Sequence, residues 1–149
     1  MTASPGPFTW KARVYWEDTD GGGIVYYANY LKILERARTE WLRSFGFSQD
    51  QLAREEGLVF TVVNLTVDYK RPAKLDDELY ITCVAHTCRA ASIRFAQRVY
   101  RGPIVMDDPA AENLLVEAQV RVGCIDCKGM RPRRMPDFLL NVLSSKELS

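Results

Sequence analysis

The spacing of apolar residues separates one helical segment from several strand segments. Between residues 28 and 45 the apolar side chains recur every three to four positions, at Tyr30, Leu34, Ala37, Trp41 and Phe45. This is the period of a helix that buries one face. Gly46 follows as a stop signal, and Ser48 can cap a short second helix that extends to Glu56. The pattern predicts one long amphipathic helix in the first third of the chain.

Most of the remaining chain alternates apolar and polar residues with a period of two, which is typical of β-strands with one buried face. One such segment precedes the helix, from Phe8 to Trp16, and four follow it, around residues 63–69, 79–85, 93–99 and 118–124. A connection rich in proline and aspartate runs from Arg101 to Asn113. From Gly129 the chain is rich in arginine and proline and becomes weakly helical near its end.

A single helix can cover only one face of about five strands. The order strand, long helix, four antiparallel strands therefore predicts an α+β hotdog fold, a curved antiparallel sheet wrapped around a central helix. We expect a single domain over residues 1–149, with residues 1–7 as a flexible leader and residues 129–149 as a basic tail. We expect the uncovered sheet face to be rich in Val, Ile and Leu and to pack on a second copy, because large exposed apolar patches are rare on soluble monomers.

Composition narrows the class of protein. The 149 residues carry a net charge of +1, so no overall field favours nucleic acid or an acidic membrane. The amino-terminal residues lack the features of a signal peptide, and no apolar run approaches the 18 residues or so of a membrane span. Four cysteines in a chain without a secretory signal indicate reduced thiols and a cytoplasmic location.

The run that leads into the long helix concentrates chemically useful groups. Glu17, Asp18 and Asp20 are followed at once by Gly21–Gly23. Crowded carboxylates raise one another's pKa, and glycines allow a close backbone approach or a positive φ. A helix start offers free N–H donors, which suit a developing oxyanion. One carboxylate beside such a donor is the minimal equipment for hydrolysing an activated acyl group.

Two other interpretations of the acidic residues stay open at this point. An aspartate ahead of a helix most often shapes a turn or caps the helix, and Glu17 and Asp18 fit that role. Asp18 and Asp20 could also hold a metal ion, although no further ligands are evident.

The cysteines and the single histidine suggest no second site. Cys124 and Cys127 have zinc-like spacing, but strand alternation buries Cys83 as a small apolar residue, and we expect no metal site. His86 is the only histidine, and it lies at a strand end without a nucleophile motif nearby. We expect His86 to lie on the surface, which excludes a triad built on it.

Two long segments carry a family resemblance. The run from Val14 to Tyr30, with Glu35 to Arg38, resembles the 4-hydroxybenzoyl-CoA thioesterase class of hotdog enzymes. The run from Val67 to Asp77 is similar to the Tol–Pal-associated acyl-CoA thioesterases, and the likeness extends through Lys128 to Arg133. It implies hydrolysis of an acyl-CoA thioester to free acid and coenzyme A. No separate cofactor is implied, because coenzyme A is part of the substrate.

The resemblance also implies roles for individual residues. The family's catalytic carboxylate falls on Asp20, acting as general base or as nucleophile. Its oxyanion donor is a backbone N–H at the helix start, which corresponds to Tyr27, where many Tol–Pal relatives carry histidine. Because this helix region has no histidine, a dehydratase is disfavoured. The predicted substrate-binding residues are Gly23, Tyr26, Arg89, Ser92, Arg131 and Arg133, with simple solvent exposure as the alternative for the tail arginines.

Assembly and partners follow from the same resemblance. It implies a homodimer or homotetramer with coenzyme A between subunits, reached by Asp20 of one chain and Arg89 of its neighbour. The alternative is a weakly catalytic module that binds acyl-CoA or acyl carrier protein and acts through partners of the cell envelope or of lipid synthesis. The acyl group stays open, since short aliphatic, long aliphatic and aromatic groups all occur on this scaffold.

Overall fold

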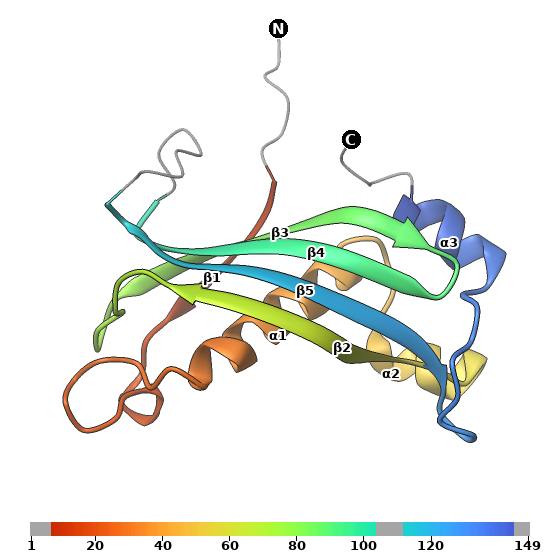
Figure 1. Ribbon diagram of the computed structural model, residues 1–149, viewed down its shortest axis with the longest axis horizontal. Coiled ribbons are helices and arrows are strands. Elements are labelled where there is room, and N and C mark those ends of the chain that lie inside the picture. Colours follow the sequence, from red (N-terminus) through yellow and green to blue (C-terminus); the bar gives the residue numbers. More distant parts are fainter. Residues whose placement is uncertain (1–6, 104–111, 145–149) are drawn as a thin grey trace, which may run out of the picture.

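The computed structural model describes residues 7–103 and 112–144, and within them five antiparallel strands form one sheet that curves around a central helix (Figure 1). The strands are β1 (Phe8–Arg13), β2 (Leu58–Tyr69), β3 (Glu78–Arg89), β4 (Ser92–Arg101) and β5 (Leu114–Asp126). Their order in the sheet is β1-β3-β4-β5-β2, so β1 and β2 form the two edges. This arrangement confirms the predicted hotdog fold.

The helices match the apolar pattern closely. Helix α1 (Asn29–Arg43) is the predicted long helix. A short helical segment follows as α2 (Gln49–Gln51) and one π-helical turn (Leu52–Glu56), and the Ser48 hydroxyl accepts a hydrogen bond from the backbone N–H of Gln51 at its start. Helix α3 (Asp137–Ser144) lies beside the end of β3 (Figure 1). Within the described ranges, no helix has the length and apolar character needed to cross a membrane.

Helix α1 packs on the concave face of the sheet. Its buried residues are Tyr30, Ile33, Leu34, Ala37, Trp41 and Leu42. The Trp41 ring meets the Phe95 ring of β4 edge-on, with ring centroids 5.1 Å apart. Gln97 of β4 is fully buried under the helix, where its amide nitrogen donates to the Leu34 carbonyl over 3.0 Å. A polar link therefore joins helix and sheet in the middle of an otherwise apolar core.

The convex face of the sheet corrects one prediction. It is polar rather than rich in Val, Ile and Leu, because strand alternation sends the apolar residues of β3, β4 and β5 toward α1. The outward positions of β4 and β5 include Arg94, Arg98, Glu117, Gln119 and Arg121. Exposed apolar side chains gather instead on edge strand β2, at Val62, Val63, Leu65 and Tyr69. The surface that a second copy could cover is thus the β2 edge.

Three other expectations concern segment ends. Strand β1 stops at Arg13 rather than Trp16, because the Val14 N–H turns to the Asp77 carbonyl and Trp16–Asp18 form a 3₁₀ turn. Most of the predicted leader and of the Arg101–Asn113 connection lies outside the described residues. The strands after Gly57 are longer than the alternation alone indicated.

Candidate active site

A tight loop before α1 carries the predicted catalytic carboxylate. Thr19 and Val25 pair as an antiparallel bridge, and the Asp20 N–H donates to the Ile24 carbonyl over 3.0 Å. Gly21 and Gly23 both have positive φ, 90° and 86°, which other residues adopt only with strain. The Val25 N–H donates to the Ala73 carbonyl, which anchors the loop near the end of the sheet. The glycines are therefore needed for the conformation of the loop that presents Asp20.

The Asp20 carboxylate is exposed and only partly engaged. Its Oδ1 accepts the backbone N–H of Gly22 over 2.9 Å. Its Oδ2 has no hydrogen-bond partner within the described part of the chain. One oxygen thus fixes the side chain, while the other is free to accept a proton from water or to attack a carbonyl carbon.

Asp18 has the structural role predicted for it. Its Oδ2 accepts the Tyr15 N–H over 2.9 Å, and its carbonyl accepts the Tyr26 N–H over 3.1 Å. The Asn29 side-chain amide donates to the same carbonyl over 2.9 Å. These contacts tie the loop to the first residue of α1, so Asp18 shapes the turn, whereas Asp20 keeps one carboxylate oxygen free.

The backbone at Tyr27 presents donors at the start of α1. The N–H groups of Tyr27 and Ala28 find no acceptor among the residues that the structure describes, and the first turn holds no acidic side chain. These N–H groups lie at the positive end of the helix dipole. The arrangement suits an oxyanion, as predicted for Tyr27.

Four tyrosines surround this helix start. The Tyr26 and Tyr27 rings lie 4.7 Å apart, and the Tyr69 ring of β2 lies 6.3 Å from Tyr27 and 5.6 Å from Tyr30. The neighbouring phenol of Tyr27 raises the pKa of Tyr26, and burial raises that of Tyr30, whose oxygen accepts the Ala73 N–H. Tyr26 is 45% exposed, so it forms a wall of the loop rather than part of the core.

The structure places the remaining predicted residues at the opposite end of the sheet (Figure 1). Arg89 and Ser92 are cross-strand partners where β3 turns into β4. Arg131 is exposed in the turn after β5, whereas the Arg133 guanidinium donates to the carbonyl of Glu56. Within one chain, these residues are therefore not brought together with Asp20, Gly23, Tyr26 and Tyr27.

Two adjoining cavities follow α1 away from the helix start. The larger, about 520 Å³, lies between Leu31 and Arg38 of α1 and the side chains of Val62 and Leu65 on β2. The smaller, about 100 Å³, continues toward an apolar end formed by Trp41, Leu42, Phe60, Ile93, Phe95 and Val122. Glu35, Arg38 and Val62 line both cavities. Neither is lined by Asp20 or Tyr27 themselves, but Leu31 stands one helical turn beyond Tyr27.

The cysteines and His86 lie apart from this loop. All four cysteines are free, and Cys83 is buried as the alternation predicted. Burial raises the pKa of the Cys124 thiol to about 12. His86 is exposed, as expected. In the two described ranges, no group of three His, Cys, Asp or Glu side chains could hold a metal ion.

Some residues with a part in this region had no role assigned from the sequence. Asn29 supports the Asp18 carbonyl, and its polar amide at the first helical position was the available signal. The Tyr69 hydroxyl donates to the Tyr27 carbonyl over 3.2 Å, which a strand pattern could not indicate. Gln97 accepts a hydrogen bond from the half-buried Arg38, and only its polarity in an apolar strand distinguished it.

A five-stranded sheet wrapped around one helix, with a carboxylate loop leading into that helix, defines a hotdog protein of the thioesterase type. The chain belongs to the thioesterase-like superfamily, whose family profile matches residues 14–143. It is 45% identical over 133 residues to the acyl-CoA thioester hydrolase YbgC of Escherichia coli O6:H1, covering 89% of this chain and 92% of that protein. It is 42% identical to the acyl-CoA thioesterase YbgC of Haemophilus influenzae, over 87% and 88% of the two chains. The crystal structure of a probable thioesterase from Bartonella henselae superposes with a TM-score of 0.78 at 35% identity, over 88% and 100% of the chains.

Proposed function

We propose that this chain is an acyl-CoA thioester hydrolase in which Asp20 and the Tyr27 backbone N–H carry out the chemistry. Membership of the thioesterase-like superfamily and the likeness to acyl-CoA thioester hydrolases support the activity. The observation that carries the residue roles is the loop itself. It combines a carboxylate that keeps one oxygen free with an N–H donor at the helix start.

The mechanism needs little further equipment, because a thioester is already activated. The Tyr27 N–H polarises the carbonyl and stabilises the oxyanion that forms on it. Asp20 either removes a proton from the attacking water or attacks the carbonyl itself to give a mixed anhydride that water then hydrolyses. In both routes coenzyme A leaves as the thiol, and no metal ion or cofactor takes part.

The two cavities along α1 are the best place for the acyl group. The larger begins at Leu31, one turn after Tyr27, and the apolar end lies beyond Arg38. Arg38 follows Leu31 by seven positions of helix, a rise of about 10 Å. An acyl group whose carbonyl sits at Tyr27 therefore extends along α1 toward Trp41 and Phe95.

We propose further that two copies pair through β2 to complete the site. This edge strand exposes apolar side chains from Val62 to Tyr69 and has backbone groups free for pairing. A two-fold axis near the middle of β2 makes the pairing antiparallel, so Tyr69 of one copy lies near Leu58 of the other. Because Tyr69 contacts Tyr27, the Asp20 loop of one copy then approaches the turn between β3 and β4 of the other copy, together with the arginines that follow β5. This pairing accounts for the distance between the Asp20 loop and these arginines within one chain.

The substrate also fits a cytoplasmic location, since acyl-CoA is an intracellular thioester and all four cysteines are free thiols.

The decisive experiment is a panel of short aliphatic, long aliphatic and aromatic acyl-CoAs, assayed by thiol release. We expect turnover of at least one class. If the purified protein binds coenzyme A but hydrolyses none of the panel, the proposal is wrong and the binding-module alternative replaces it.

A further inference from the structure

The convex face of the sheet holds two arginines directly opposite one another. Arg94 of β4 and Arg121 of β5 are cross-strand partners, and both are exposed. The Cβ atoms of such partners lie about 4.5–5.5 Å apart, and like charges at that separation destabilise a sheet. Within residues 7–103 and 112–144, neither arginine forms an ion pair or a side-chain hydrogen bond. The repulsion between them is therefore uncompensated by any described residue of the chain.

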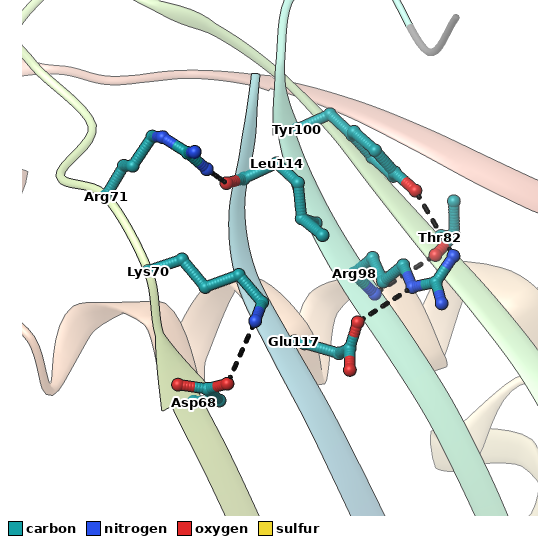
Figure 2. A network of polar contacts seen from close by, with 8 residues as sticks. All are labelled: Asp68, Lys70, Arg71, Thr82, Arg98, Tyr100, Leu114 and Glu117. Carbon is teal, nitrogen blue, oxygen red and sulfur yellow. Dashed lines mark hydrogen bonds and ion pairs between the residues drawn. The ribbon is translucent and has the colours of Figure 1, made fainter. Parts of the chain in front are cut away.

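Four residues away on the same two strands, an arginine faces a residue of opposite charge instead. Arg98 and Glu117 are also cross-strand partners, and their side chains form an ion pair of 3.2 Å (Figure 2). Nearby, Asp68 of β2 and Lys70, which directly follows this strand, form a second ion pair of 3.0 Å (Figure 2). One end of the convex face is thus electrically balanced, whereas the end with Arg94 and Arg121 is not.

The unbalanced end adjoins residues already linked to coenzyme A by resemblance. Ser92 stands two residues before Arg94, so both point to the same face, and Arg89 is the cross-strand partner of Ser92. Arg89 and Arg94 are diagonal neighbours, a spacing of about 7–8 Å that long side chains can bridge. We call Arg89, Arg94 and Arg121 the arginine patch. The other residues in its rows are uncharged, namely Thr61, Asn64, Thr87, Ser92 and Gly123.

We propose that the arginine patch binds the phosphates at the nucleotide end of coenzyme A, with Arg94 and Arg121 as phosphate ligands beside Arg89. Guanidinium groups bind phosphate oxygens through paired charge-assisted hydrogen bonds, and a bound polyanion removes the repulsion between Arg94 and Arg121. A two-fold contact whose axis passes through the patch would bring the same positive charges together, which disfavours a second copy centred there. This inference rests on the proposed function, which supplies the ligand.

The experiment compares two substrates that differ only in the nucleotide. The double variant Arg94→Gln/Arg121→Gln is assayed on an acyl-CoA and on the matching acyl-pantetheine, which lacks the phosphates of the nucleotide. We expect its KM for acyl-CoA to rise about tenfold with kcat unchanged, since two charge-assisted contacts are lost. Its kinetics on acyl-pantetheine stay at the wild-type values. Added salt weakens acyl-CoA binding by the wild type more than by the variant.

Arg98→Gln is the matched control, because it removes one positive charge from the same strand and face but from a side chain already paired with Glu117. It leaves the KM for acyl-CoA within twofold of wild type. The inference is overturned if the double variant keeps wild-type KM for acyl-CoA, or if it loses activity equally on both substrates. A change in mass by light scattering also overturns it, because the patch is then an interface between copies.

Failure of the proposed function gives a different result. A wild type that hydrolyses neither substrate contradicts the enzymatic proposal, and calorimetric binding of coenzyme A and pantetheine then tests the patch alone. We expect wild type to bind coenzyme A about tenfold more tightly than the double variant does. Equal affinity of the two proteins for coenzyme A overturns the inference.

Discussion

The hydroxyl of Tyr69 donates a hydrogen bond to the carbonyl of Tyr27 over 3.2 Å. Tyr69 ends the edge strand β2, while Tyr27 supplies the proposed oxyanion donor just before α1. One polar contact thus links the end of the sheet edge to the residue that carries the proposed donor. Its importance is testable, because the phenol ring and the hydroxyl can be separated by a single substitution.

Tyr69→Phe keeps the ring contacts with Tyr27 and Tyr30 but removes this hydrogen bond. We expect kcat to fall about three- to tenfold with little change in KM, because the backbone that follows the proposed Tyr27 donor loses one anchor while the two cavities along α1 stay intact. The free energy of unfolding falls by about 0.5–1 kcal/mol, as for a partly exposed hydrogen bond. Steady-state kinetics and urea unfolding measure the two effects. An unchanged kcat would show that this contact does not position the donor.

Asp20→Asn and Asp18→Asn separate the chemical from the structural acid. We expect Asp20→Asn to fold normally and to lose about 10²- to 10⁴-fold in turnover, the usual effect of removing a positioned acid or base. Asn at position 18 retains an oxygen that can accept the Tyr15 N–H, so the loop survives and the loss is less than tenfold. Kinetics on one acyl-CoA and circular dichroism test both variants. A larger loss from the Asp18 change would reverse the assignment within the acidic run.

Short-range pattern was enough to predict most of the fold. The apolar positions of α1, the Ser48 cap and the period-two strands depend on neighbours in sequence, and all were confirmed. The composition of the convex face depends on which alternate residues meet the helix, and there the expectation was wrong. Arg94 and Arg121 lie 27 positions apart, so their opposition becomes visible only once β4 and β5 pair in register.

The candidate site also has one part that the sequence predicted and another that only the folded structure shows. The loop that carries Asp20, Gly23 and Tyr27 is continuous in sequence, and its geometry fits the predicted roles. The contributions of Tyr69 and Gln97 arise from contacts across 42 and 63 positions. A single sequence gives no measure of such long-range pairs. The roles of Arg89, Ser92, Arg131 and Arg133 stay predictions that depend on a second copy.

The buried link between Arg38 and Gln97 yields a prediction on stability. Burial lowers the pKa of Arg38, and its Nη1 donates to the Gln97 oxygen over 3.0 Å. We expect Gln97→Leu to cost about 2–4 kcal/mol, because it leaves a half-buried cation without this acceptor. The double variant Arg38→Met/Gln97→Leu loses less than the sum of the single variants, since both polar groups are replaced together. Urea unfolding of the three variants completes the cycle, and strict additivity would contradict a direct coupling.

The thiols provide a prediction on pH. Burial raises the pKa of Cys124 to about 12 and places that of Cys83 well above its usual range. Since only the thiolate reacts, we expect both residues to resist iodoacetamide at pH 8 in the folded protein and to react in urea. The folded state also holds these protons more firmly than the unfolded chain, so their contribution to stability declines as pH rises from about 9 toward 12. Mass spectrometry of labelled peptides tests the first point, and rapid native labelling of Cys124 would contradict the burial.

The last prediction concerns complementation between copies. If β2 pairs with β2 about a two-fold axis, each site takes Asp20 from one chain and Arg89 from the other, because the Asp20 loop is anchored just before β3 begins and Arg89 ends that strand. Asp20→Asn and Arg89→Ala each damage both sites of their own dimer. A mixed dimer holds one site with both changes and one with neither, so its turnover approaches half of the wild-type value. The two variants are unfolded and refolded together, and turnover is compared with each variant refolded alone. Recovery no greater than the sum of the separate activities, or a fully active monomer by light scattering at nanomolar concentration, would show that each chain builds its site alone.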